Sequence, residues 1–202
     1  MPQPAFAVTD IQGSTELWER LGPAFAPVLA DHNRILRETI AEFGGSVLRT
    51  EGDSFTAAFP AATAALRFAT ETLLRLHRHS WPEEAGELLI RIGVHSGTAE
   101  PETGAASRYS GALLSLAAAV SAAAHGGQAL ATAEAIEAAR SALGDAAVTD
   151  LGEHRLAAGT ARVRLLQARF SPTSPAKRMP SWGVKRSCAS CRRCSPPRRG
   201  AS

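Results

Sequence analysis

Hydrophobic positions along the first 170 residues follow two periods, and their order predicts the fold. A period near 3.6 residues is typical of a helix that buries one face, whereas a short run rich in apolar and β-branched residues is typical of a strand. Gly44-Gly45 ends the first long helical pattern, because glycine accepts a left-handed backbone there. The patterns predict strands at 5–9, 47–50, 54–59, 88–96, 128–132, 148–151 and 161–170, and helices at 22–43, 61–79, 111–124 and 133–143, with a further helical pattern opening at Ser14.

This order mixes hairpins with helical crossovers. The short link Glu51-Gly52-Asp53 between two apolar runs indicates a hairpin. We therefore expect an α+β fold, a ferredoxin-like βαββαβ sandwich with additional αβ elements, in which helices cover one face of a mainly antiparallel sheet. In such a sheet the first strand and the 47–59 hairpin are central neighbours.

The composition changes abruptly after Phe170, which predicts a domain at 1–170 and a separate tail at 171–202. The tail holds eight of the 22 basic residues, five of the 12 prolines and none of the 19 acidic residues. Such a segment buries too little apolar surface to offset its ordering entropy, so we expect it to be disordered.

Charge and hydropathy narrow the classes of partner. Without the tail, 14 basic residues face 19 acidic ones, so the domain has a net charge of −5 and the pI of about 9.1 comes from the tail. Nucleic-acid binding by the domain is therefore not expected. No apolar run approaches the ~20 residues of a membrane span, and no signal peptide opens the chain, so we expect a cytoplasmic protein without membrane contact.

All three cysteines lie in the tail, as Cys188, Cys191 and Cys194. Their spacing is compatible with metal or iron–sulfur ligation, but the tail has no fourth cysteine and no histidine. Exposed, unligated thiols are the preferred interpretation.

Two aspartates stand at strand ends where a metal-bound phosphate could sit. Asp10 ends the first strand and is followed by a glycine turn into a helix, and Asp53 lies in the hairpin link. Two carboxylates one strand apart can hold a pair of divalent cations, and the free N–H groups of the turn can face phosphate oxygens. The alternative for each aspartate is an ordinary turn residue.

Five stretches in order resemble one family: FAVTDIQGST, LRTEGDSFTAAF, IRIGVHSG, HGGQAL and DLGEHRL. Together they are similar to the catalytic domain of class III adenylyl and guanylyl cyclases, over roughly residues 5 to 169. In this family a nucleoside triphosphate is converted to a 3′,5′-cyclic monophosphate and pyrophosphate with two Mg²⁺ or Mn²⁺ ions. Head-to-tail dimers place the active sites at the interface. The partners implied are ATP or GTP and a second cyclase-type chain, in a homodimer or heterodimer.

The resemblance assigns the first half of the site. Asp10 and Asp53 match the two metal-binding aspartates, and the backbone of Ile11 is expected to help hold metal. Residues 12–14, which are Gln12, Gly13 and Ser14, are expected to line the phosphates.

The base-reading and phosphate positions depart from the family pattern. Arg49 stands where the family has a base-reading lysine, and Arg108 stands where it has an acidic or small polar residue. A basic residue that binds the triphosphate is matched by Ala157, with Arg155 as a neighbouring candidate. These departures leave ATP and GTP undistinguished.

The transition-state positions depart further, because Ser115 stands for the family's Asn and Ala119 for its Arg. A guanidinium aimed at developing phosphate charge contributes about 10³-fold or more in rate. No residue can therefore be assigned confidently as catalytic, and a homodimer is expected to be weak or inactive.

Three functions remain open on these residues. The first is a degenerate cyclase that binds metal and nucleotide, as a regulatory or pseudoenzyme subunit. The second is an active cyclase, alone or as the metal-donating half of a heterodimer. The third is a basic-tail binding protein with the cyclase fold as a scaffold. The retained aspartates favour the first two.

Within the strand motif IRIGVHSG, Arg91 and His95 are interpreted as structural residues.

Overall fold

A computed structural model describes residues 3–98, 111–143, 147–156 and 162–169. The chain divides into two units, Met1–Ser171 and Pro172–Ser202. The predicted disordered tail and its three cysteines lie outside the described residues. Within the described part of the chain, no helix is long and apolar enough to cross a membrane.

The elements follow the predicted order with small shifts at their ends. The strands are β1 (Ala5–Ile11), β2 (Ser46–Glu51), β3 (Ser54–Phe59), β4 (Ile90–Ser96), β5 (Gln128–Thr132), β6 (Ala147–Arg155) and β7 (Arg162–Arg169). The helices are α1 (Ser14–Leu21), α2 (Phe25–Glu42), α3 (Ala62–Arg78), α4 (Gly111–Ala123) and α5 (Ala133–Ala139), with 3-10 turns η1 (Gly22–Ala24) and η2 (Arg140–Ala142). The helix predicted from residue 22 starts as α-helix only at Phe25, because Gly22 has a positive φ and Pro23 follows it.

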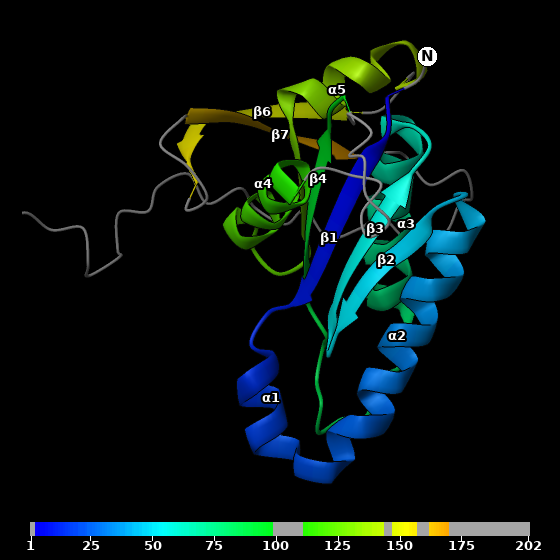
Figure 1. The fold of residues 1–202 in the computed structure, drawn as a ribbon. Helices are drawn as coiled ribbons and strands as arrows, with labels where there is room; N and C mark the ends of the chain where they lie inside the picture. Colours follow the sequence, from blue (N-terminus) through cyan, green and yellow to red (C-terminus); the bar gives the residue numbers. More distant parts are fainter. Residues whose placement is uncertain (1–2, 99–110, 144–146, 157–161, 170–202) are drawn as a thin grey trace, which may run out of the picture. The chain divides into compact units, whose positions relative to one another are not determined.

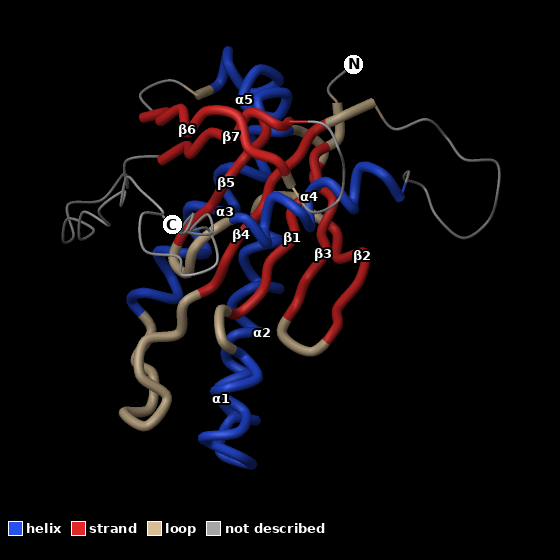
Figure 2. The backbone as a smooth tube through the Cα atoms, turned by 90° about the vertical axis from the view of Figure 1, so that its left-hand side faces the viewer, coloured by secondary structure: helices blue, strands red, loops and turns tan. Residues whose placement is uncertain are grey.

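The strands form one sheet in the order β2-β3-β1-β4-β5-β7-β6 (Figure 2). Among the described strands every neighbouring pair is antiparallel except β4 and β5. The predicted α+β class and the mainly antiparallel sheet are confirmed. β1 lies between β3 and β4, so its end is flanked by the β2–β3 hairpin on one side and by β4 on the other.

Helices cover both faces of the sheet, so the expectation of helices on one face was wrong. Alternate residues of β1 belong to different clusters: Ala5 and Ala7 pack with residues of α2 and α3, whereas Phe6 and Val8 pack with Ala117 of α4. Figure 1 shows α4 in front of the sheet and α3 behind it. The reason is that β4 and β5 are parallel, so the chain must cross over through α4, and this crossover covers the second face.

Gly93 permits the close approach of α4 to β4. A Cβ at this position would overlap backbone atoms of Ala117 and Ser121, which lie on α4. Backbone atoms cannot rotate away as a side chain can, so any larger residue must push the helix off the sheet.

We expect Gly93→Ala to lower the free energy of unfolding by about 1–3 kcal/mol through this overlap. Denaturant unfolding of the full chain measures the change. Gly111→Ala is the matched control, because a Cβ at Gly111 meets nothing within 4 Å. An equal response of the two variants would contradict the proposed role of Gly93.

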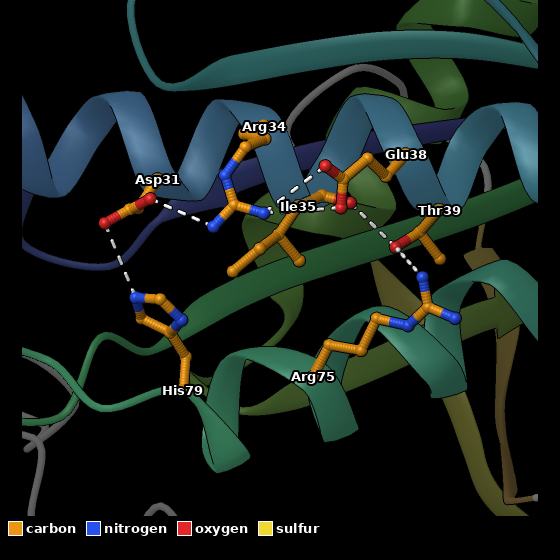
Figure 3. Close-up of polar contacts among 7 residues, drawn as sticks. All are labelled: Asp31, Arg34, Ile35, Glu38, Thr39, Arg75 and His79. Carbon is orange, nitrogen blue, oxygen red and sulfur yellow. Dashed lines mark hydrogen bonds and ion pairs between the residues drawn. The ribbon is translucent and has the colours of Figure 1, made fainter.

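Ion pairs and hydrogen bonds join the outer surfaces of α2 and α3 (Figure 3). Arg34 lies between Asp31 and Glu38 on α2, at 3.0 and 3.3 Å. From α3, Arg75 donates to the hydroxyl of the buried Thr39 at 3.4 Å, and His79, which directly follows α3, has its Nε2 3.6 Å from Asp31 Oδ2. Exposed pairs of this kind stabilise by only about 0–1 kcal/mol each, so the buried apolar faces of the helices carry the packing.

Candidate metal and nucleotide site

The turn that holds Asp53 lies beside the end of β1, where Asp10 stands. The β1–β3 register runs to Thr9 opposite Phe55, so the next residues of β1 lie beside the β2–β3 turn. The backbone N–H of Ile11 donates to Asp53 Oδ2 at 2.9 Å. This bond fixes the Asp53 carboxylate next to the residue that directly follows Asp10.

The turn that holds Asp53 is a tight one. Glu51 and Ser54 are paired across the hairpin, so only Gly52 and Asp53 lie between the strands. Gly52 has φ of 60°, a left-handed conformation that suits glycine. A glycine in this place allows the carboxylate of the next residue to turn back toward β1.

The segment after Asp10 leads into a helix N-terminus without a side-chain cap. Gly13 occupies the N-cap position with φ of 72°, and as a glycine it has no side chain to cap the first turn of α1. The first N–H groups of a helix carry partial positive charge and have no partner within the helix. This end of α1 could therefore receive a phosphate oxygen near the two aspartates.

Gln12 has a role that the sequence did not indicate. Its side-chain oxygen accepts a hydrogen bond from the backbone N–H of Gly126. Its backbone N–H donates to the backbone carbonyl of Leu89 at 2.9 Å. Gln12 therefore ties the turn after β1 to the segments on either side of it. Its side-chain oxygen already accepts the Gly126 N–H, so contact with phosphate would come from its side-chain amide nitrogen or from neighbouring residues.

Asp10 is paired with Arg91, which stands directly opposite it on β4. Arg91 Nη2 donates to Asp10 Oδ2, and both side chains are about 30% exposed. The interpretation of Arg91 as a structural residue of the strand missed this contact. The register of β1 against β4, which the sequence does not reveal, was needed to find it.

A buried histidine lies beneath the aspartates. His32 of α2 is fully buried, its Nδ1 lies 2.9 Å from the Asn33 side-chain oxygen, and its Nε2 has no hydrogen-bond partner among the described residues. Burial lowers the pKa of His32, and the negative charges of Asp53 and Asp10 oppose that effect. The signal was present in the sequence, since His32 interrupts the apolar stripe of its helix at a core position.

The donor chemistry of this corner fits a hard divalent cation. Two carboxylates and nearby backbone carbonyls are the oxygen ligands that Mg²⁺ and Mn²⁺ prefer. Within the described residues, no group of three or more His, Cys, Asp or Glu side chains forms a metal cluster. A metal at Asp10 and Asp53 would therefore need further oxygens, from backbone groups such as the Ile11 carbonyl, from water or from a triphosphate.

Two of the other predicted positions, Arg49 and Arg155, are described by the structure. Arg49 is on the edge strand β2, where its exposed guanidinium pairs with Glu51. Arg155 is exposed at the end of β6, opposite Arg162. Arg108 and Ala157 lie outside the described residues. Among the described residues, the structure thus places Asp53 beside the backbone that follows Asp10 and places Arg49 on the edge strand.

Ser115 and Ala119 lie one turn apart on α4. Ser115 is exposed, and Ala119 is half-buried against an apolar cluster that includes Val120 and Leu130. Neither side chain can supply a cation.

His95 of β4 is buried in the structure. Its Nδ1 lies 2.9 Å from the Thr132 hydroxyl, and burial lowers its pKa.

The sequence of this chain matches a known protein family over most of its length. The family model of the adenylate and guanylate cyclase catalytic domain matches residues 5–161. The chain belongs to this family. The resemblance predicted from the sequence motifs is thereby confirmed. Proteins with this cyclase domain bind ATP or GTP, generally use divalent metal ions and typically dimerise.

Two curated relatives are fungal adenylate cyclases much longer than this chain. An adenylate cyclase of Lachancea kluyveri is 35% identical over an alignment of 145 residues, and the match covers 61% of this chain and 8% of that protein. An adenylate cyclase of Mycosarcoma maydis is 33% identical over an alignment of 163 residues, and the match covers 70% of this chain and 6% of that protein. The chain thus spans less than a tenth of the length of either relative.

Solved cyclase structures share the fold. An adenylate cyclase from Trypanosoma brucei in its monomeric state aligns with a TM-score of 0.72 at 25% identity, covering 83% of this chain and 90% of that one. The guanylate cyclase domain of RhGC from Catenaria anguillulae, in complex with GTP, aligns with a TM-score of 0.68 at 16% identity, covering 83% and 96%. The second likeness concerns the fold alone.

Proposed function

We propose that this chain is the metal-donating half of a class III cyclase site, which binds Mg²⁺ or Mn²⁺ together with ATP or GTP through Asp10 and Asp53. As a homodimer it turns over slowly or not at all. It acts either as a regulatory, degenerate subunit or as one half of an active heterodimer with a cyclase chain that carries the missing groups.

The observation that carries the proposal is the hydrogen bond between Ile11 N–H and Asp53 Oδ2 at 2.9 Å. It holds the Asp53 carboxylate against the backbone of β1, at the residue after Asp10, before any ligand arrives, so little ordering of this side chain is left for binding to accomplish. Two acidic residues at neighbouring strand ends supply the oxygen ligands that a divalent ion takes, and a scaffold without ligand-binding function does not need them. This geometry favours a metal and nucleotide site over the basic-tail binding function.

The residues of this chain would divide the work between charge and position. Asp10 and Asp53 would hold the divalent ions, whose chemistry is to activate the attacking ribose oxygen and stabilise the pyrophosphate leaving group. The uncapped N-terminus of α1 after Gly13 would bind triphosphate oxygens through its free N–H groups. Ser14, half-buried in the first turn of α1, is placed to add a hydroxyl.

The weak turnover follows from α4. Ser115 can donate one hydrogen bond, but it is shorter than asparagine, and Ala119 supplies no charge for the developing phosphate. In a head-to-tail homodimer both sites would receive the same deficient α4 from the partner. A heterodimer with an Asn- and Arg-bearing chain would complete one of its two sites.

We expect the full chain to bind nucleotide in the presence of Mn²⁺ and to form little cyclic product. Binding of ATP and GTP is measured by calorimetry with and without Mn²⁺, and cyclic nucleotides are measured by chromatography. Asp10→Asn should remove the Mn²⁺-dependent binding. Rapid turnover that Asp10→Asn abolishes would overturn the degenerate subunit in favour of a self-sufficient cyclase, and absence of Mn²⁺-dependent binding would overturn the metal and nucleotide site itself.

A further inference from the structure

Two buried polar side chains near the end of β1 have an atom that the fold leaves without a partner. Thr9 of β1 is 1% exposed, and His32 of α2 is fully buried. Thr9 Oγ1 and His32 Nε2 both have no hydrogen-bond partner among the described residues. Because an unpaired buried polar atom is destabilising, such atoms in folded proteins nearly always bond to a protein group or to internal water. These two atoms therefore need a partner.

Phe55 of β3 places the two side chains in the same layer of the core. Thr9 stands directly opposite Phe55 in the β1–β3 register, and opposite residues of an antiparallel pair point to the same face of the sheet. The ring of His32 packs against the ring of Phe55, with the centroids 6.2 Å apart. Ala5 and Ala7, which alternate with Thr9 along β1, belong to the same core cluster as Phe55. Thr9 and His32 thus flank one phenylalanine on the face that α2 covers.

The hydrogen bond at Nδ1 of His32 determines the chemistry of its Nε2. Nδ1 lies 2.9 Å from Asn33 Oδ1, and a carboxamide oxygen only accepts, so Nδ1 carries the proton. Burial lowers the pKa of His32, which favours the neutral ring. In a neutral ring with its proton on Nδ1, Nε2 is an acceptor. His32 therefore presents an acceptor to the layer that it shares with Thr9.

The Thr9 hydroxyl has the complementary chemistry. A hydroxyl donates one hydrogen bond and can accept others, and the pairing of Thr9 with β3 and β4 uses its backbone rather than its side chain. The described Thr9 and His32 atoms do not bond to each other directly. One water molecule between them would satisfy both, which is how internal water typically joins polar groups in proteins.

We propose that one internal water molecule joins the two side chains, donating to His32 Nε2 and accepting from the Thr9 hydroxyl. The link ties α2 to the residue that directly precedes Asp10. His32 is then a positioning residue for the end of β1, where the Ile11 N–H also holds Asp53. The positioning role rests on the proposed metal and nucleotide function, whereas the link itself does not.

The first test is a double-mutant cycle on the full chain, measured by denaturant unfolding. Valine has the shape of threonine without the hydroxyl, and methionine has the length of glutamine without the amide. We expect Thr9→Val and His32→Met each to raise the equilibrium constant of unfolding about tenfold, and the double variant to raise it little further, because the link is broken only once. His32→Gln, which keeps an acceptor near the position of Nε2, should be less destabilising than His32→Met.

Thr39→Val is the matched control for the cycle. Thr39 is a buried threonine of α2, but its hydroxyl donates to the Ile35 carbonyl at 2.7 Å. The effect of Thr39→Val should therefore add to that of His32→Met. A Thr9→Val chain as stable as the parent, or more stable, would show that the hydroxyl has no partner and would overturn the link.

Nuclear magnetic resonance of the imidazole nitrogens tests the link without relying on stability. In the parent, the nitrogen shifts of His32 should place the proton on Nδ1 and a hydrogen bond at Nε2. The Nε2 resonance should move in Thr9→Val and stay in place in Thr39→Val. A proton on Nε2 of the parent would contradict the tautomer on which the link depends.

Binding of ATP with Mn²⁺ separates the positioning role from the link. We expect Thr9→Val to weaken this binding about tenfold, as removal of a group that orients a metal ligand does, and Thr39→Val to leave it unchanged. Equal binding by Thr9→Val and the parent would overturn the positioning role. If the parent itself binds no ATP with Mn²⁺ while the cycle and the resonances show coupling, the proposed function is wrong and the link stands.

Discussion

A chain carrying Ser115→Asn and Ala119→Arg together is expected to form cyclic nucleotide about 10³-fold faster than the parent in the presence of Mn²⁺. The reason is that the parent supplies metal ligands but no group to stabilise the charge that develops on the transferred phosphoryl group. Both positions can accept the change. Ser115 is exposed, and Ala119 is half-buried, so an arginine can extend its charged end from the apolar cluster to solvent. Initial rates with ATP and with GTP measure the gain.

The matched control moves the charge by one residue. Ala118 is exposed and adjacent, so Ser115→Asn with Ala118→Arg adds the same groups while pointing the guanidinium in another direction along α4. This control should gain little. A doubly substituted chain that binds Mn²⁺ and nucleotide but gains no more than the control would contradict the assignment of Ala119 as the vacant transition-state position.

Mixing two inactive chains tests whether the halves act across a dimer. One chain is the parent, which keeps both aspartates. The other carries Asp10→Asn and Asp53→Asn together with the two α4 substitutions, Ser115→Asn and Ala119→Arg. It therefore supplies the transition-state groups without metal ligands. Activity that appears only in the mixture is expected of a head-to-tail arrangement. The contrary result is activity of the chain that carries Ser115→Asn and Ala119→Arg with both aspartates intact, without activity in the mixture. It would indicate that each site is completed within one chain.

The sequence was a good guide to this molecule wherever a local pattern determines structure. The apolar run in β1 and the helical spacing in α2 predicted those elements to within two or three residues. The Glu51-Gly52-Asp53 link predicted the hairpin that brings Asp53 toward β1, because turn chemistry is read from a few adjacent residues. The position of this hairpin beside β1 agrees with the predicted neighbours in the sheet.

Contacts that depend on register were not predictable in the same way. Arg91 lies opposite Asp10 because of the register of β4 against β1. A register shift of one residue would move its side chain to the other face of the sheet. Gln12 meets Gly126 across 114 positions of sequence. The face that α4 covers likewise depends on the parallel pairing of β4 with β5, which local hydrophobic spacing does not specify.

Asp53 has two separable roles, and each has its own substitution. Its carboxylate accepts the Ile11 N–H, which holds the β2–β3 turn against β1, and its charge is proposed to hold metal. Asparagine keeps an acceptor oxygen at nearly the same place but loses the charge, whereas alanine loses both. The pair of variants therefore distinguishes a turn residue from a metal ligand.

We expect Asp53→Asn to lower Mn²⁺-dependent nucleotide binding by at least about 100-fold, since a neutral amide is a poor ligand for a hard divalent ion. Its free energy of unfolding without metal should stay within about 0.5 kcal/mol of the parent, because the Ile11 hydrogen bond can still form. Asp53→Ala should lose the binding and about 1–2 kcal/mol of unfolding free energy as well, since the Ile11 N–H loses its acceptor. Calorimetric titration and denaturant unfolding measure the two effects.

Asp31→Asn serves as the control for a neutralised carboxylate away from the site, because Asp31 lies on the outer surface of α2 with Arg34 and His79 (Figure 3). It should leave nucleotide binding unchanged. Full Mn²⁺-dependent binding in Asp53→Asn would reduce Asp53 to a turn residue, and the metal would then depend on Asp10 alone. Loss of binding with the fold intact is the result that only a metal ligand gives, since a turn residue would lose stability first.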